Sequence, residues 1–160
     1  MQFSAAILLA TAAVAATPGA DDARAFFDDF VGRSNRCDAS GFAHYDPAAA
    51  LQTLRDGNKR QEITGEQIRA MGATATTIAK RRGEQNAFED IRIEARDDGY
   101  RILATRISSA KCTRDPNYRM DIVHRGDDWR IVAEYTETNS LTRCEPSKRL
   151  AAALARTRNT

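Results

Sequence analysis

The chain of 160 residues has few of the residue types and motifs on which catalytic and metal sites commonly depend. It contains three cysteines and two histidines, and no two cysteines have the C-x-x-C spacing of zinc or thioredoxin-like sites. Glycine-rich phosphate loops, the H-E-x-x-H motif and the G-x-S-x-G motif are also missing. Nothing in these patterns indicates a metal or a cofactor, so we expect neither.

The sequence also lacks an excess of charge of one sign. It has 24 basic and 22 acidic residues, which gives a formal net charge of +2. Nucleic-acid-binding proteins usually carry a dense basic patch. The nearest approach to one is Lys80-Arg81-Arg82, and cations at the end of a helix more often complement the helix dipole. We therefore do not expect a nucleic-acid partner.

No apolar run approaches the length of about 20 residues that a membrane-spanning helix needs. The most apolar segment, Ala5–Ala16, fits the central region of a secretory signal, and Ala13-Val14-Ala15 is a natural cleavage site. Its leading residues carry no Lys or Arg, so an apolar N-terminal helix of the fold is the alternative. We expect a signal peptide at residues 1–16 and a flexible start at 17–21. The mature protein would then be periplasmic or secreted, without membrane insertion.

The three cysteines are Cys37, Cys112 and Cys144, and an oxidising compartment favours a disulfide between two of them. We expect the pair to be Cys112 and Cys144, because the first ends a predicted strand and the second follows the last strand of the same meander. Such a bond contributes about 3 kcal/mol in the chain-entropy model. Cys37 would then be a buried free thiol or would form an intermolecular link.

Hydrophobic periodicity predicts one α+β domain at residues 22–140 and a tail at 141–160. Its elements are a helix, a hairpin, a second helix and a four-stranded antiparallel meander. The expected turns are Tyr45-Asp46-Pro47, Asp56-Gly57 and Thr113–Pro116, and Thr64 and Gln67 form a capping box for the second helix. Helices are expected at 21–35 and 64–82, with a short helical turn at 42–44, and strands at 48–55, 59–63, 88–96, 100–112, 118–125 and 129–138. The helices should cover one face of a curved sheet.

This order of elements resembles the nuclear-transport-factor-2-like superfamily, and within it the SnoaL-like and steroid-isomerase-like branch. Four segments carry the resemblance: Phe26-Phe27, Tyr45-Asp46-Pro47-Ala48, Ile63–Ile68 and Gly126–Val132. It implies a cone-shaped half-barrel, in which a curved antiparallel sheet has its helices on the concave side. It also implies a pocket between the sheet and the helices, and it allows a homodimer formed through the sheet, as in many relatives.

Four residues are candidates for binding a ligand in such a pocket. Tyr45 belongs to a turn that could line the pocket mouth. Arg106 shares its strand face with Tyr100, Ile102 and Ala104, and if that face points inward Arg106 would need an anionic partner or ligand there. The opposite face of the same strand is also apolar, so either face could be the inward one. His124 alternates in phase with apolar residues and could face the cone, although packing is the alternative. Tyr135 shares a predicted face with Trp129, and core packing is again the alternative.

The sequence does not provide a recognisable catalytic set. A steroid-type isomerase needs a carboxylate base together with a Tyr and a protonated Asp. Asp121 is a poor candidate for the base, because its neighbours Met120 and Ile122 should face the core and turn it towards water.

We therefore expect an exported, non-catalytic domain that binds a small, partly apolar molecule. Two alternatives remain open at this stage. One is a protein-interaction module of the cell envelope, which a contiguous apolar patch on the convex sheet face would favour. The other is a cofactor-independent isomerase, cyclase or dehydratase that works by acid–base chemistry.

Overall fold

The computed structural model describes residues 18–109 and 113–140. The expected signal peptide, both members of the expected disulfide and the C-terminal tail therefore lie outside the described residues. Within these ranges, the elements are α1 (Ala20–Asn35), η1 (Ala39–His44), β1 (Tyr45–Arg55), β2 (Lys59–Thr64), α2 (Gly65–Arg82), β3 (Asn86–Arg96), β4 (Gly99–Ser108), β5 (Thr113–Arg125) and β6 (Asp128–Ser140).

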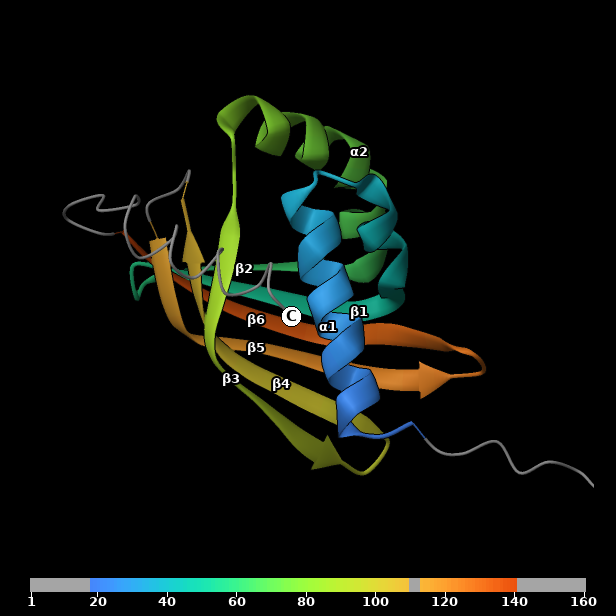
Figure 1. Ribbon diagram of the computed structural model, residues 1–160. Coiled ribbons are helices and arrows are strands. Elements are labelled where there is room, and N and C mark those ends of the chain that lie inside the picture. The colour runs from blue at the N-terminus through green and yellow to red at the C-terminus, as the bar shows by residue number, and fades with distance from the viewer. Residues whose placement is uncertain (1–17, 110–112, 141–160) are drawn as a thin grey trace, which may run out of the picture.

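The six strands form one open, curved sheet in the order β2-β1-β6-β5-β4-β3 (Figure 1). The four-strand meander and the β1–β2 hairpin are confirmed as antiparallel units. The sheet as a whole is mixed, however, because β1 and β6 are parallel, and this corrects the wholly antiparallel expectation. The reason is the crossover through α2, which carries the chain to the far edge of the sheet. The meander then returns towards β1, and its last strand runs in the same direction.

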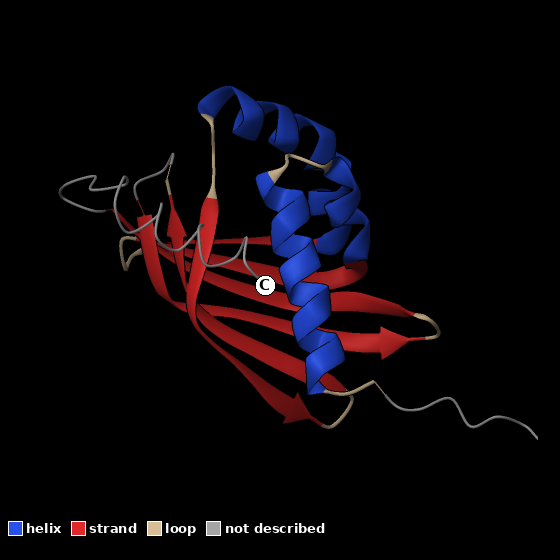
Figure 2. Cartoon of the chain, viewed as in Figure 1, coloured by secondary structure: helices blue, strands red, loops and turns tan. Residues whose placement is uncertain are grey.

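All of the described helices lie on the concave side of the sheet, as the predicted α+β class requires (Figure 2). α1 crosses in front of the sheet and α2 lies beyond one end of it (Figure 1). Among the described residues, no helix is both long and apolar enough to cross a membrane.

Local turn and capping chemistry follows the sequence closely in the first half of the chain. Asp56 and Gly57 both have positive φ, 48° and 71°, in the turn between β1 and β2, where the Asn58 N–H donates a hydrogen bond to the Arg55 carbonyl. Thr64 caps α2 by accepting a hydrogen bond from the Gln67 N–H, and Gln67 Oε1 accepts one from the Thr64 N–H. α1 begins differently from expectation. Its N-cap is Gly19, and Asp22 accepts a hydrogen bond from the Gly19 N–H.

Two predicted turns are wrong, because they lie inside strands. Tyr45-Asp46-Pro47 opens β1, and Thr113–Pro116 opens β5. Each proline falls in an irregular stretch of pairing, between Tyr45 and Ala50 on the β6 side of β1 and between Arg114 and Arg119 on the β6 side of β5. Such bulges leave residues unpaired, so a proline there does not cost a ladder hydrogen bond. The predicted strand to Cys112 is also too long, because β4 ends at Ser108.

One glycine fixes the position of α2 on the sheet. Gly65 is the first residue of α2, and a Cβ at this position would lie 1.8 Å from the backbone oxygen of Asp46. No other residue type fits such an approach without backbone movement. The start of α2 is therefore held against the start of β1, and the rest of the helix projects over the open end of the sheet.

The core lies between α1 and the middle of the sheet. Phe27 of α1 is fully buried and contacts the rings of Phe88 and Tyr118 with centroids 5.1 and 6.2 Å away. The other large, fully buried apolar residues are Ile102, Met120, Ile122 and Ile131. Each such side chain contributes about 1.5–3 kcal/mol by burial. This core occupies one half of the concave face and leaves the other half for a pocket.

Candidate functional site

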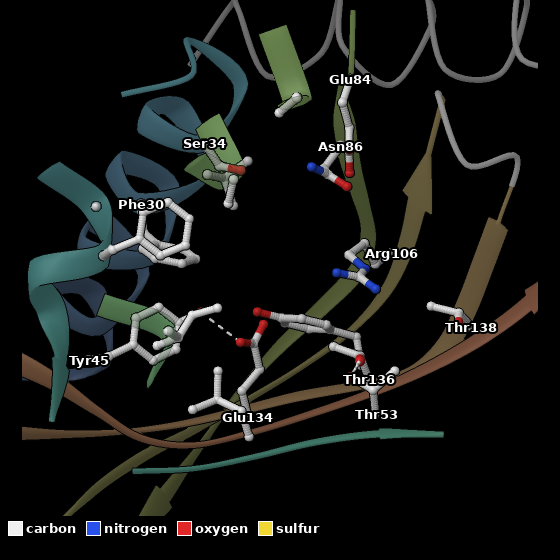
Figure 3. Close-up of a pocket in the computed structure, with 18 of the residues that line it drawn as sticks. Phe30, Ser34, Tyr45, Thr53, Glu84, Asn86, Arg106, Glu134, Thr136 and Thr138 are labelled. Atoms are coloured by element: carbon white, nitrogen blue, oxygen red, sulfur yellow. Dashed lines mark hydrogen bonds between the residues drawn. The ribbon is translucent and has the colours of Figure 1, made fainter. Parts of the chain in front are cut away.

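A half-open pocket of about 670 Å³ lies between the helices and the concave face of the sheet (Figure 3). Its size is in the range typical of small-molecule sites. The helix side contributes mainly apolar residues, and the sheet contributes most of the polar ones. The apolar residues include Phe30, Val31, Phe42, Ile68, Ala75 and Ala79. The polar residues on the sheet include Thr53, Arg106, Tyr118, Glu134, Thr136 and Thr138.

Tyr45 and Glu134 form the most direct polar contact in the pocket. The Tyr45 hydroxyl donates a 2.7 Å hydrogen bond to Glu134 Oε2, which Figure 3 shows as a dashed line. Burial raises the pKa of Tyr45 well above its usual range, and the charge of Glu134 raises it further. The same two causes raise the pKa of Tyr118. Both phenols therefore remain protonated donors, turned towards one carboxylate.

A bulge in β6 brings Glu134 into the pocket. Asp121 of β5 pairs with Ala133, but the next residue of β5, Ile122, pairs with Ile131. Val132 is therefore the extra residue, and the alternation of side chains changes phase across it. Ile131 faces the core before the bulge, and Glu134, Thr136 and Thr138 face the pocket after it. Without the bulge, Glu134 would point away from the helices.

Arg106 enters the pocket from β4, on the other side of Glu134 from Tyr45 in the view of Figure 3. Its side chain is 19% exposed, and its Cζ lies 5.6 Å from the centre of the Tyr118 ring. The nearest carboxylate oxygen is Asp115 Oδ2, which is 3.9 Å from Nη2. That distance allows an ionic attraction but is too long for a hydrogen bond.

Asp115 is buried behind Arg106 and is held by the backbone. Its two carboxylate oxygens accept hydrogen bonds from the Asn117 N–H at 3.1 Å and from the Glu137 N–H at 2.8 Å. Desolvation raises the pKa of Asp115, and this effect outweighs the opposite effects of the two N–H groups and of Arg106. Asp115 therefore supports the backbone between β5 and β6 and leaves the guanidinium of Arg106 turned to the pocket.

The remaining polar side chains of the sheet floor are threonines. Thr53 and Thr136 share a 2.9 Å hydrogen bond between their hydroxyls. Thr138 is 8% exposed, and its Oγ1 has no hydrogen-bond partner among the described residues. A buried hydroxyl without a partner is uncommon in folded proteins and is costly.

The structure brings two of the four predicted site residues together and separates the other two. Tyr45 and Arg106 both line the pocket, although Tyr45 is buried at its floor and does not form its mouth. His124 does not line it and packs instead against Trp129, with ring centroids 5.0 Å apart. Tyr135 faces the convex side of the sheet, where Arg119 lies over its ring, because the bulge at Val132 reverses the predicted face.

Two further residues named from the sequence lie away from the pocket. Trp129 packs against Phe26 and Tyr100, as the packing interpretation predicted. Asp121 faces away from Met120 and Ile122, as expected, and forms a bidentate pair with Arg101 through two 2.7 Å hydrogen bonds. It is therefore tied to the outer face of the sheet.

Sequence reasoning missed Glu134, Tyr118 and Asp115. The run Ile131-Val132-Ala133 is a signal that could have indicated Glu134, because three successive apolar residues break strict alternation and are typical of a bulge. Asp115 was hidden because Pro116 suggested a turn. Within the described residues, no group of three or more His, Cys, Asp or Glu side chains could hold a metal ion.

Comparison with known proteins identifies the fold. No protein-family profile and no curated protein matches the chain. A nuclear-transport-factor-2-like protein from Cytophaga hutchinsonii matches with a TM-score of 0.60 at 9% identity, over 76% of this chain and 99% of that one. A second, from Novosphingobium aromaticivorans and described as having a cystatin-like fold, matches with 0.56 at 12% identity, over 84% and 86%.

The β subunit of benzoate 1,2-dioxygenase from Burkholderia mallei matches with a TM-score of 0.56 at 16% identity, over 78% of this chain and 93% of that one. At identities this low, the likeness concerns the fold and not the chemistry of the site. The curved sheet, the helices on its concave side and these structural neighbours lead to one conclusion: this protein has the nuclear-transport-factor-2-like fold, also described as cystatin-like.

Proposed function

We propose that this protein is an exported, non-catalytic domain that binds a small, partly apolar molecule in the pocket between its helices and the concave face of its sheet. The observation that supports this most directly is the division of the pocket walls. The helix side is mainly apolar, and a few polar groups converge from the sheet, in a cavity of about 670 Å³. This combination is typical of small-molecule sites.

The first test is native mass spectrometry of the mature protein, purified after export and never denatured. A non-covalent companion of a few hundred daltons, lost on collisional activation, is the expected result. The variant Ala75→Trp should abolish it, because Ala75 lines the pocket from α2 and a large ring there would fill the space. Ala73→Trp is the matched control, because Ala73 lies two residues earlier on the same helix, is exposed and does not line the pocket. If the companion is bound to the same extent in both variants, the proposal is contradicted.

The acid–base alternative has less support from the geometry. An enzyme of that kind needs a carboxylate that is available to take a proton from its substrate. Glu134 already accepts the hydrogen bond from Tyr45, and Asp115 accepts its own from two backbone N–H groups. The inward carboxylates on β5 and β6 are thus engaged within the protein, which favours binding over proton transfer.

A second candidate function is a protein-interaction module of the cell envelope. Two observations favour it: one structural neighbour is a subunit of a larger enzyme, and the large apolar residues exposed in the described part of the chain are Met71 and Ile78, both on α2. These residues are on α2 and not on the convex sheet face, where an apolar patch would have favoured this alternative. The homodimer through the sheet remains a prediction, and sedimentation velocity of the wild type beside a Tyr135→Glu variant would test it. Tyr135 faces that side, so a sheet-mediated dimer should dissociate.

A further inference from the structure

We propose that the ligand of this pocket carries a carboxylate, which binds to Arg106 at the end of the pocket where β1, β4 and β6 contribute Arg55, Arg106 and Thr138. This inference rests on the binding function proposed above and specifies the chemical class of the ligand.

The first observation is that Arg106 has unused hydrogen-bonding capacity. A guanidinium has five N–H donors in a planar arrangement. Among the described residues, none of these donors has a hydrogen-bond acceptor, and the one nearby carboxylate is 3.9 Å away. The two oxygens of that carboxylate are already occupied by backbone N–H groups. The charge of Arg106 is therefore balanced by Asp115, but its N–H donors face the pocket without an acceptor among the described residues.

The second observation is a further donor at the same end. Thr138 is buried and lines the pocket, and its Oγ1 has no partner among the described residues. Its Cα partner on β1 is Arg55, which also lines the pocket. Paired residues on neighbouring strands project to the same face of a sheet. Two guanidinium groups and one unpartnered hydroxyl thus belong to one end of the cavity.

The third observation is that the acidic side chains of the pocket lie elsewhere or are occupied. Asp38 accepts a hydrogen bond from the Ser40 N–H, and Glu134 accepts one from Tyr45. Glu134 is four residues before Thr138 on β6, a separation of about 13 Å along a strand. Glu84 lies on the same side of the pocket as Arg106, beside Asn86 (Figure 3), but it is not free.

These positions orient the ligand. Its carboxylate binds at the Arg106 end, because a planar guanidinium matches a carboxylate in a two-point contact. Its apolar body then extends towards Phe30, Phe42 and Ile68 on the helix side. A neutral ligand would leave the donors of Arg106 without an acceptor in a site from which it excludes water, which is unfavourable.

The test uses matched probes with the same apolar body and different head groups. The probes are octanoate, 3-phenylpropanoate and 2-naphthoate, each beside its primary amide and its primary alcohol. Binding to the mature protein would be measured by isothermal titration calorimetry, and contact with the protein by saturation-transfer NMR. We expect the carboxylate of at least one body to bind about tenfold or more tightly than its amide and alcohol, which is the effect of one good charged hydrogen bond.

Substitutions then test which residues produce the preference for the carboxylate over the amide and the alcohol. Arg106→Gln should remove it, so that the carboxylate, amide and alcohol of one body bind with similar affinities. Thr138→Val should reduce it, and this variant keeps the shape of the side chain in case Arg106→Gln folds poorly. Arg101→Gln is the matched control: Arg101 is on the same strand, is similarly exposed at 21% and also faces a carboxylate, but it lies on the outer face. It should leave the preference intact.

The outcomes separate this inference from the proposed function. If the amide or the alcohol binds as tightly as the carboxylate for each of the three apolar bodies, the inference that the ligand carries a carboxylate is overturned. The proposed binding function of the pocket is then unaffected. A carboxylate preference that survives in both Arg106→Gln and Thr138→Val would also overturn it. If no probe with any head group binds, and Ala75→Trp changes nothing, the proposed function fails as well.

Discussion

Tyr45 and Glu134 lie on β1 and β6, two neighbouring parallel strands of the sheet, and are joined by a 2.7 Å hydrogen bond at the floor of the pocket. A hydrogen bond to a charged group in a buried site contributes about 1.5–3 kcal/mol. Tyr45→Phe should therefore lower the free energy of unfolding by about 2 kcal/mol, measured by chemical denaturation. A double-mutant cycle that combines it with Glu134→Gln should give a coupling energy of at least about 1 kcal/mol. Tyr135→Phe, on the opposite face, is the control and should change little.

Cys37 offers a way to stabilise the protein. α1 and α2 end in the same motif, in which the N–H groups of Cys37 and Gly83 bond three residues back, and those of the residues after them bond five residues back. Both residues have positive φ, 54° and 58°, a conformation that costs a residue with a Cβ about 1–2 kcal/mol. Cys37→Gly removes this cost. Part of the gain is lost, because glycine has more conformational freedom in the unfolded chain, so the net stabilisation should be up to about 1 kcal/mol. The reciprocal change, Gly83→Cys, should destabilise it, and the same sign for both would contradict this account.

The pH dependence of stability should carry a contribution of unusual sign from Asp115. Burial raises its pKa above the ordinary value of 3.8, so the folded protein keeps this proton at a pH where the unfolded chain has lost it. Its contribution to stability is therefore fullest below pH 3.8 and declines as pH rises through the folded pKa. The stability difference between wild type and Asp115→Asn should shift in favour of the wild type as pH falls through that window.

Asp38 provides the opposite case as a control. Its hydrogen bonds from Ser40 lower its pKa, so its contribution is present above pH 3.8 and is lost as pH falls through the folded pKa. The difference between wild type and Asp38→Asn should thus move against the wild type on acidification. Unfolding curves for both variants across the same pH series would check the two signs together.

Thr138→Val should make the unliganded protein more stable. The substitution removes a buried hydroxyl that has no partner among the described residues and keeps the shape of the side chain. Leaving such a group unsatisfied costs about 1–3 kcal/mol, so a gain of about 1 kcal/mol is expected, seen as a higher Tm. Thr53→Val is the contrast, because it breaks the Thr53–Thr136 hydrogen bond and should lower the Tm. A fall in Tm for Thr138→Val would mean that the hydroxyl is satisfied.

The disulfide between Cys112 and Cys144 remains a prediction from the sequence, because both residues lie outside the described ranges. The exported protein should be lighter than the reduced chain by the mass of two hydrogens. After unfolding without reductant, iodoacetamide should label one cysteine, Cys37, out of the three. Labelling of all three would exclude the bond, and labelling of none would indicate that Cys37 is linked to a second molecule.

The sequence predicted the order of elements and the fold well, because the signals involved are local. The capping box at Thr64, the Asp56-Gly57 turn and the alternation in the meander each depend on a few neighbouring residues. The parallel pairing of β1 with β6 was not predicted, because it depends on how far α2 carries the chain before the meander starts.

The pocket was predicted in part, and the errors have a common cause. Arg106 was a candidate because one face of its strand carries Tyr100, Ile102 and Ala104, although both faces are apolar. Tyr135 was named in place of Glu134 because a single extra residue at Val132 reverses the face. Tyr118 was missed for the same kind of reason, since the irregular pairing between Arg114 and Arg119 sits in what was predicted to be a turn. A bulge has a weak sequence signal and a large effect on which side chains meet.

The position of β6 between β1 and β5 has a consequence for how the chain folds. β6, the last strand in the described part of the chain, joins the two halves of the sheet, and its pairing of Ala133 with Ala50 spans 83 residues, which is 133 minus 50. Contacts of such long range form slowly, because the loop must close before the contacts stabilise it. The ribosome must therefore release the chain through β6 before the native sheet can assemble. If the N-terminal segment directs export, this delay keeps the polypeptide unfolded, and so able to be translocated, until β6 has been made.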